Sequence, residues 1–142
     1  IYISPLKALA ADIRRNLRRP VEGAKLAIRI EDRTSDTSHT QRQRQRGDPP
    51  HILLTTPESL ALLLSYEDAP RIFAGLRRVI VDEIHALAEG KRGDQLMLAL
   101  SRLAALAPGL RRVGLSATVN DPPALARYLD PRGCRVLEAD PG

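Results

Sequence analysis

Short apolar runs alternate along the chain with segments in which apolar residues recur at helical spacing. Two of the runs, 52–54 and 79–81, contain no polar residue, which is typical of strands buried on both faces of a parallel sheet. Six segments predict strands: 1–3, 25–30, 52–54, 79–81, 112–115 and a last short one at 134–137. Strand and helix alternate throughout, so the pattern predicts an α/β fold with a parallel sheet and helices on both faces.

The segments between these strands predict the helices. The first begins at Ser4-Pro5, a capping residue followed by proline, and Pro20 ends it. Residues 39–46 have no apolar face and indicate either a surface helix or an ordered loop that touches an anion. The remaining helical segments begin at Thr56-Pro57, within 68–75, at Gly93 after a loop over 86–92, and at Asp121.

The run 79–81 ends abruptly in Asp82, Glu83 and His85. In open parallel sheets, ligands are held at the carboxyl ends of the strands. A pair of carboxylates there is well placed to hold a cation and steer a water molecule. A strand that simply runs into an acidic, solvated loop is the alternative interpretation.

Hydroxyl groups mark three other strand ends. Ser4-Pro5, Thr34–Thr37 and Thr56–Ser59 each place hydroxyls and backbone N–H groups at the start of a predicted helix. Helix N-termini attract phosphate, so three of them along one sheet edge could follow a nucleic-acid backbone. Each is also explained as an ordinary helix cap.

The charge and composition of the chain limit the kinds of partner that it can be expected to bind. The 142 residues suit one domain, and 22 Lys and Arg against 17 Asp and Glu give a net charge of +5, which favours a polyanionic partner. Solvated arginines without a partner are the alternative. Three Tyr, one Phe and no Trp make base stacking a poor binding mode. Cys134 is the single cysteine, and no apolar run approaches the roughly 20 residues of a membrane span, so we expect a cytoplasmic protein with no membrane partner.

Four segments in order carry a resemblance to a known family. DEIH at 82–85, followed about thirty residues later by SAT at 116–118, resembles motifs II and III of superfamily 2 helicases. SPLKAL at 4–9 and TTPESL at 55–60 resemble motifs Ia and Ib. With RTSDT, a Gln/Arg-rich segment, KRG and GLSAT, the chain resembles the large helicase-related (Lhr) family, most closely its ligase-associated DNA-damage-response DEXH-box branch.

The resemblance implies roles for individual residues. Asp82 would hold Mg²⁺ through water, and Glu83 would orient or deprotonate the water that attacks the γ-phosphate of ATP. His85 would sense the nucleotide and couple it to Ser116, Ala117 and Thr118. Ten residues fall on the segments that grip the nucleic-acid backbone: Ser4, Pro5, Lys7, Arg33, Thr34, Asp36, Thr56, Pro57, Glu58 and Ser59.

The resemblance also implies a fold and a setting. Residues 1–142 would be part of the first RecA-like lobe, a three-layer, P-loop NTPase-type domain, of an ATP-dependent 3′→5′ DNA helicase or translocase of DNA repair. Its partners would be single-stranded DNA or a DNA or RNA–DNA duplex backbone, a second RecA-like lobe with downstream domains, and a DNA-repair ligase or nuclease. The setting would be the nucleoid of a bacterial cytoplasm.

Two departures from the family pattern qualify this expectation. The chain contains no G-x-x-x-x-G-K-[ST] phosphate loop, since Gly90-Lys91 is its single Gly-Lys pair and Arg92 follows it. We therefore expect an inactive fragment whose sheet lacks the phosphate-loop strand and has a gap or a rearranged pairing. Ser35 stands where relatives carry glycine. Two alternatives remain: a non-enzymatic nucleic-acid-binding remnant, and a metal-dependent hydrolase or nuclease built on Asp82, Glu83 and His85.

Overall fold

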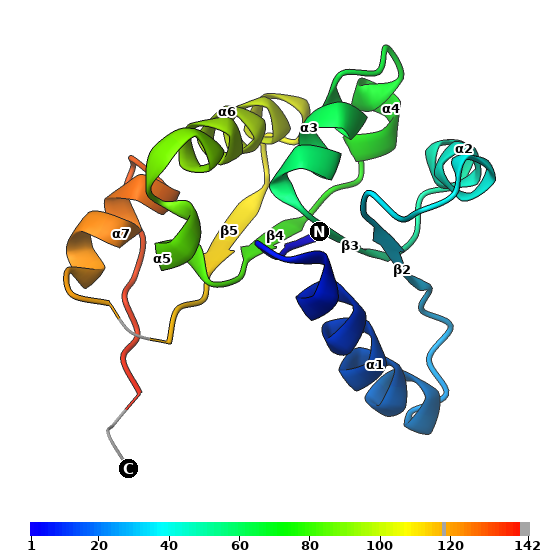
Figure 1. The fold of residues 1–142 in the computed structure, drawn as a ribbon, viewed down its shortest axis with the longest axis horizontal. Helices are drawn as coiled ribbons and strands as arrows, with labels where there is room; N and C mark the ends of the chain where they lie inside the picture. Colours follow the sequence, from blue (N-terminus) through cyan, green and yellow to red (C-terminus); the bar gives the residue numbers. More distant parts are fainter. Residues whose placement is uncertain (118, 140–142) are drawn as a thin grey trace.

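The computed structural model describes residues 1–117 and 119–139. Its five strands form one parallel sheet in the order β2-β3-β1-β4-β5 (Figure 1). The strands are β1 (Tyr2–Ile3), β2 (Ile30–Arg33), β3 (Ile52–Thr55), β4 (Arg78–Val81) and β5 (Arg111–Gly114). The predicted α/β fold with a parallel sheet is confirmed.

Helices cover both faces of the sheet, as predicted, but unequally (Figure 1). They are α1 (Lys7–Gly23), α2 (His39–Gly47), α3 (Pro57–Leu64), α4 (Ala69–Phe73), α5 (Ile84–Leu87), α6 (Gly90–Leu106) and α7 (Pro122–Leu129). On one face α1 packs against β2 and β3. The opposite face carries α3, α4, α5, α6 and α7, and α2 lies beside β2. No helix in the described ranges is long and apolar enough to cross a membrane.

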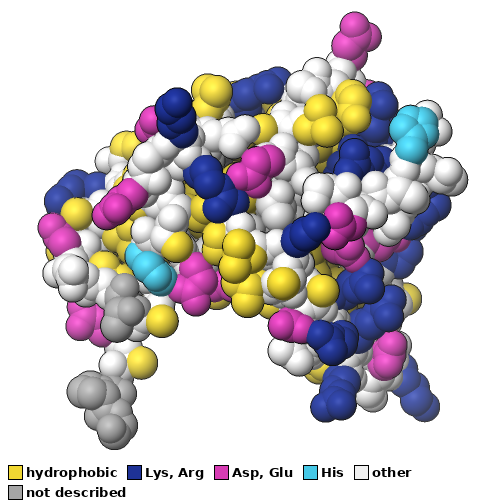
Figure 2. All heavy atoms as spheres, viewed as in Figure 1, with side chains coloured by type: hydrophobic (Ala, Val, Ile, Leu, Met, Phe, Trp, Pro, Cys, Tyr) yellow, Lys and Arg dark blue, Asp and Glu magenta, His cyan; other side chains and the backbone are white. Residues whose placement is uncertain are grey.

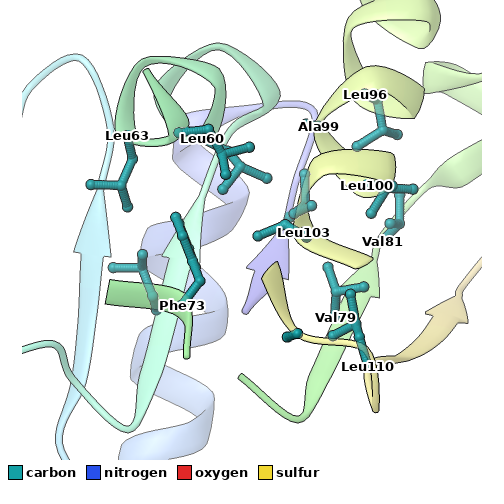
Figure 3. Close-up of a cluster of buried hydrophobic side chains, with 14 of the residues drawn as sticks. Leu60, Leu63, Phe73, Val79, Val81, Leu96, Ala99, Leu100, Leu103 and Leu110 are labelled. Atoms are coloured by element: carbon teal, nitrogen blue, oxygen red, sulfur yellow. The ribbon is translucent and has the colours of Figure 1, made fainter. Parts of the chain in front are cut away.

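The larger core lies on the face covered by α3 and α6 (Figure 3). Leucines at helical spacing on these helices, such as Leu60 and Leu100, are fully buried against Val79 and Val81 of β4. The core under α1 is smaller and centres on the buried residues Ala10, Ile30 and Leu54. Because α1 does not extend over β4 and β5, Ile80 is half-buried and its register partner Val113 is 40% exposed. The prediction that residues 79–81 are buried on both faces is therefore wrong for Ile80.

The ends of α1 differ from the prediction. Its N-cap is Leu6, without a side-chain cap bond, so Ser4-Pro5 lies in the turn before the helix. Pro20 lies inside α1, which continues to Gly23. Proline lacks an N–H and crowds the preceding turn, but its fixed φ is itself helical, so residues after it can continue the helix.

The strand predicted at 25–30 is displaced towards the C-terminus and forms β2. Its pairing with β3 starts only where Ile30 meets Ile52. The charged residues Glu31 and Asp32, which are depleted in strands, are paired with Arg44 and Arg14 respectively. These partners come from neighbouring helices, so the local sequence does not reveal them.

Three further predictions are revised. Residues 86–92 are not a loop throughout, because α5 and the start of α6 at Gly90 occupy most of them. No strand forms at 134–137 in the described part of the chain. The five described strands pair without a gap, since β1 pairs with both β3 and β4, and β4 pairs with β5. By contrast, the helical starts at Pro57 and Pro122 are confirmed.

Candidate functional site

All five strands end at one edge of the sheet. Their last residues stand in register across the sheet in the order Arg33, Thr55, Ile3, Val81 and Gly114. With strands about 4.8 Å apart, this edge is about 19 Å long. The junctions after β4 and β5 are neighbours and form what we call the acidic end. The junctions after β2, β3 and β1 are also neighbours and form what we call the hydroxyl end.

A left-handed turn shapes the acidic end. The backbone N–H of Asp82 donates to the carbonyl of Ile3 at 2.8 Å, and the Asp82 carboxylate accepts from the N–H of Glu83 at 2.9 Å. Glu83 has φ 48° and ψ 44°, a conformation that costs a residue with a Cβ about 1–2 kcal/mol. This turn lets α5 begin immediately after β4, which brings His85 back towards the strand ends.

The structure joins the β4 and β5 junctions. The N–H of Ile84 donates to the carbonyl of Leu115 at 3.0 Å. His85 Nδ1 lies 2.6 Å from Ser116 Oγ and 3.4 Å from Glu83 Oε2. The predicted residues Glu83, His85 and Ser116 therefore meet in one place. Ala117 is exposed beside them, and Thr118 lies outside the described residues.

Tyr2 is an additional residue close to the carboxylates. Its partial burial, together with the neighbouring carboxylates of Asp82 and Glu83, raises the pKa of the phenol above its ordinary value. The two carboxylates thus disfavour a third negative charge beside them, and the phenol is a hydroxyl donor next to the acidic end.

The donor set at the acidic end fits Mg²⁺ held partly by water. Asp82 and Glu83 are half-buried carboxylates at a strand end. No cluster of three or more metal-ligating side chains occurs in residues 1–117 and 119–139. Mg²⁺ keeps several waters and is commonly bound by one or two carboxylates together with substrate phosphates. A site of this kind needs only the carboxylates that are present.

At the hydroxyl end, the β3 junction is a capped helix start. Thr56 Oγ1 accepts from the N–H of Ser59, and Pro57 occupies the first turn of α3. Glu58 is exposed in the same turn, where its negative charge interacts favourably with the positive end of the helix dipole. The predicted cap at 56–59 is confirmed.

The β2 junction is a compact polar turn tied to α1. The N–H of Thr34 donates to Thr37 Oγ1 at 2.9 Å, and Thr34 Oγ1 accepts from the N–H of Asp36. Lys7 Nζ, in the first turn of α1, lies 2.9 Å from Asp36. Ser35 adopts no positive φ, so the absence of glycine there causes no backbone strain. The structure thus brings Lys7, Thr34 and Asp36 together, but the N-cap of α2 is Ser38, so the prediction that the turn at 34–37 starts this helix is wrong.

Five of the ten residues predicted to bind the nucleic-acid backbone are buried: Ser4, Arg33, Thr34, Thr56 and Pro57. Ser4 is fully buried, and its hydroxyl donates to the carbonyl of Leu6. Arg33 is 1% exposed and donates to the carbonyl of Arg42, while Tyr66 lies 5.9 Å from its guanidinium carbon. Burial lowers the pKa of Arg33. These side chains support the hydroxyl end and do not reach its surface.

Sequence reasoning gave no role to two arginines that organise this edge. Arg42 Nη2 donates to the carbonyls of Thr34 and Ser35 and so fixes the β2 turn. Arg92, in the first turn of α6, contacts both Pro5 and Glu58. The signal available in the sequence was weak, because each arginine stands among other basic residues.

Basic side chains gather over α1 and α2 (Figure 2). Part of this charge is neutralised at the hydroxyl end, where Lys7 pairs with Asp36 and Arg92 with Glu58. Arginines of the flanking helices are also paired, as Arg14 is with Asp32 and Arg44 with Glu31, so the net charge of +5 belongs to the chain as a whole. A net positive charge attracts a polyanion without specifying its sequence.

Comparisons with known proteins agree with this arrangement. A family model described as DEAD/DEAH box helicase matches residues 1–125. The ATP-dependent helicase Lhr-Core of Methanothermobacter thermautotrophicus is 49% identical over 138 residues, which cover 91% of this chain and 16% of that relative. The Lhr helicase/uracil glycosylase of Escherichia coli is 42% identical, with 91% of this chain and 9% of the relative covered.

Solved structures give the same picture. The structure of Mycobacterium smegmatis helicase Lhr bound to ssDNA and AMP-PNP matches with a TM-score of 0.84 and 44% identity, covering 94% of this chain and 18% of that one. Helicase MrfA bound to DNA and AMPPNP matches with a TM-score of 0.84 at 23% identity, which supports the fold alone. The chain thus spans a fifth or less of the length of these proteins.

Proposed function

Because this chain belongs to the DEAD/DEAH box helicase family, we propose that it serves as part of the first RecA-like lobe of an Lhr-type, ATP-dependent 3′→5′ DNA helicase or translocase. The observation that carries the proposal is the order in which the five strand ends follow one another along the sheet edge. The sheet order places the carboxylates and His85 at one end of a single edge and the hydroxyl-rich turns at the other. Nucleotide chemistry and backbone binding can therefore act side by side on one rigid sheet.

The acidic end is assigned to the nucleotide. Asp82 would hold Mg²⁺ through water, and the metal would neutralise charge on the phosphates of ATP. Glu83, held in its left-handed turn, would orient and deprotonate the attacking water. His85 and Ser116, 2.6 Å apart, would pass the state of the nucleotide to the β5 junction, with Ala117 and Thr118 continuing that segment.

The hydroxyl end is assigned to the DNA backbone. The buried threonines of this end shape the turn at 34–37 and the start of α3 through internal hydrogen bonds. The groups nearer the surface are the hydroxyls of Ser35 and Ser59, and the α3 N-terminus adds its dipole. Contacts of this kind bind phosphate without reading bases. Single-stranded DNA, or the backbone of a DNA or RNA–DNA duplex, is the expected ligand.

The complete activity requires more than this chain. A phosphate loop, a second RecA-like lobe and downstream domains would complete the motor, and we expect the 142-residue chain alone neither to hydrolyse ATP nor to unwind duplexes. We place the whole protein in DNA repair at the bacterial nucleoid, with a repair ligase or nuclease as partner. DNA-stimulated ATP hydrolysis by the isolated chain would contradict the first expectation.

The test of the proposed function is Glu83→Gln in the full-length protein. The amide keeps the shape of the side chain but cannot accept a proton, so ATP turnover should fall by about 10²–10⁴-fold while nucleotide binding persists. Glu89→Gln, at an exposed carboxylate six positions further on, is the matched control and should retain turnover. Turnover at the wild-type rate in Glu83→Gln would exclude the assigned role.

Polarity is tested separately. Strand displacement by the full-length protein on duplexes with a 3′ or a 5′ single-stranded tail should require the 3′ tail. Equal displacement on both substrates would contradict 3′→5′ movement. DNA binding without any ATP turnover in the full-length protein would favour a non-enzymatic binding module.

A further inference from the structure

Arg92 connects three segments that lie far apart in the sequence. Its Nε donates to Glu58 Oε1 at 2.6 Å, and its Nη2 donates to the carbonyl of Pro5 at 2.8 Å. Pro5 follows β1 and Glu58 follows β3, so both acceptors belong to the hydroxyl end. Arg92 itself lies in the first turn of α6, just after the acidic end.

The backbone of Arg92 is fixed relative to the acidic end. A Cβ at the next residue, Gly93, would lie 2.4 Å from the carbonyl oxygen of Leu87 at the end of α5. Glycine at position 93 therefore permits α6 to pack directly on the short helix that carries His85. Tyr128 of α7 reinforces this packing by donating to the Gly93 carbonyl at 2.8 Å. The first turn of α6, which carries Arg92, is therefore in direct backbone contact with α5.

The shape of the guanidinium suits a double contact. The planar guanidinium can donate to a carboxylate and to a backbone carbonyl at the same time. A lysine ammonium is a point charge and cannot reproduce this planar geometry. The contact with Glu58 also neutralises a carboxylate on the surface assigned to phosphate. Arg92 and Glu58 side chains are 44% and 50% exposed, and pairs this exposed add little to folding stability. We therefore expect the double contact of Arg92 to act mainly on the placement of the β1 and β3 junctions.

We propose that Arg92 is a positioning residue that links the acidic end to the hydroxyl end and sets how the β1 and β3 junctions meet DNA. This inference rests on the proposed function, because it concerns communication between the two ends of that site. Arg92 acts through Pro5 and Glu58, and the variants below test the link without altering either carboxylate of the acidic end.

The test measures ATP turnover of the full-length protein as a function of single-stranded DNA concentration. Arg92→Met removes both contacts at nearly constant length, and should raise the DNA concentration for half-maximal stimulation by about three- to tenfold. The DNA-independent rate should stay within about twofold of wild type, and the rate at saturating DNA should change less than the half-maximal concentration. Arg92→Lys keeps the charge and should fall between wild type and Arg92→Met.

Lys91→Met is the matched control. Lys91 is the adjacent, exposed basic residue, and its side chain makes no hydrogen bond or ion pair within the described residues. The Lys91→Met variant loses one positive charge from the same helical turn as Arg92→Met does. Its ATP turnover should respond to DNA like that of the wild type. A similar loss in Lys91→Met and Arg92→Met would show that only charge matters and would overturn the proposal.

Two other outcomes overturn it as well. One is an unchanged half-maximal DNA concentration in Arg92→Met. The other is a parallel fall of the DNA-independent and DNA-stimulated rates together with the melting temperature, which would indicate a purely structural residue. Absence of DNA stimulation in the wild type would instead refute the proposed function, and the inference with it, so the two failures are distinguishable.

Discussion

The two ends of the sheet edge are held together by different kinds of contact. At the acidic end, backbone hydrogen bonds connect Asp82 to Ile3 and Ile84 to Leu115, and Glu83 is fixed in a left-handed turn. At the hydroxyl end, exposed charged side chains from distant elements meet, as in the pairs Lys7–Asp36 and Arg92–Glu58. The difference suits the assigned roles, because positioning a water molecule demands a rigid backbone. An exposed ion pair such as Lys7–Asp36 can instead rearrange at small cost when a polyanion arrives, whereas Arg92 is held by a second contact, to the carbonyl of Pro5.

The cores beneath the two ends also differ. Behind the acidic end, Ile84 and Leu87 of α5 belong to the large cluster that α3 and α6 form on the sheet. Leu60 and Leu63 of α3, which follows the β3 junction, belong to that cluster too. The much smaller cluster under α1 contains Ile30 of β2 and Leu54 of β3. The acidic end is therefore backed by the large core, and the hydroxyl end by both cores. The predictions below test this contrast.

Gly93→Ala should have the largest effect, because it acts on the rigid end. The added Cβ would clash with backbone atoms of α5, which cannot move away as a flexible side chain could. We expect a loss of about 3 kcal/mol in the free energy of unfolding of the 142-residue chain, measured by urea denaturation. Gly23→Ala, at a helical glycine with open space around it, is the control and should be neutral or slightly stabilising. Equal stability of the two variants would refute the close packing of α5 and α6.

Ser116→Ala should have a smaller effect that appears in function. It removes the hydrogen bond between His85 and Ser116 but leaves the backbone contacts between the two junctions in place. In the full-length protein we expect about a tenfold lower rate of strand displacement at a given rate of ATP hydrolysis. Ser101→Ala removes a hydroxyl that donates only within α6, to Met97, and serves as control. An unchanged ratio of strand displacement to ATP hydrolysis in Ser116→Ala would show that the hydrogen bond between His85 and Ser116 does not couple hydrolysis to movement.

Thr56→Ala tests the hydroxyl end. Removing the hydroxyl that caps α3 should cost about 1 kcal/mol of unfolding free energy, and Thr56→Ser should restore most of it. Urea denaturation of the chain measures both. A cost as large as that of Gly93→Ala would show that the two ends are equally dependent on local contacts, contrary to the comparison.

Local patterns predicted much of this fold. Apolar runs identified β3 and β4, and cap-plus-proline starts identified α3 and α7, because their determinants lie within a few neighbouring residues. The displacement of β2 was not predictable in this way, because Glu31 and Asp32 are tolerated in a strand only through distant arginines. The continuation of α1 past Pro20 was also missed, since a proline near a helix end signals a stop only statistically.

The candidate site was also predictable from the sequence only in part. Its residues could be found from spacing and family resemblance, but their grouping depends on the sheet order, which is a non-local property. Arg92 reaches partners 34 and 87 positions away in the sequence, so no local pattern could assign it. The left-handed conformation of Glu83 arises from the turn between β4 and α5 and is likewise invisible in residue types.

Acidification should produce the smallest effect, at the exposed hydroxyl end. The hydrogen bond from Lys7 holds the pKa of Asp36 below its ordinary value. A carboxylate whose pKa is lower in the folded than in the unfolded chain contributes stability that is complete above the unfolded pKa and disappears as the pH falls through the folded pKa. Asp36→Asn should therefore be slightly less stable than wild type at pH 7, and the difference should vanish below the folded pKa of Asp36. Urea denaturation of both chains between pH 7 and pH 2 measures it, and a difference that persists or grows in acid would show that Asp36 acts through its shape and not through its charge.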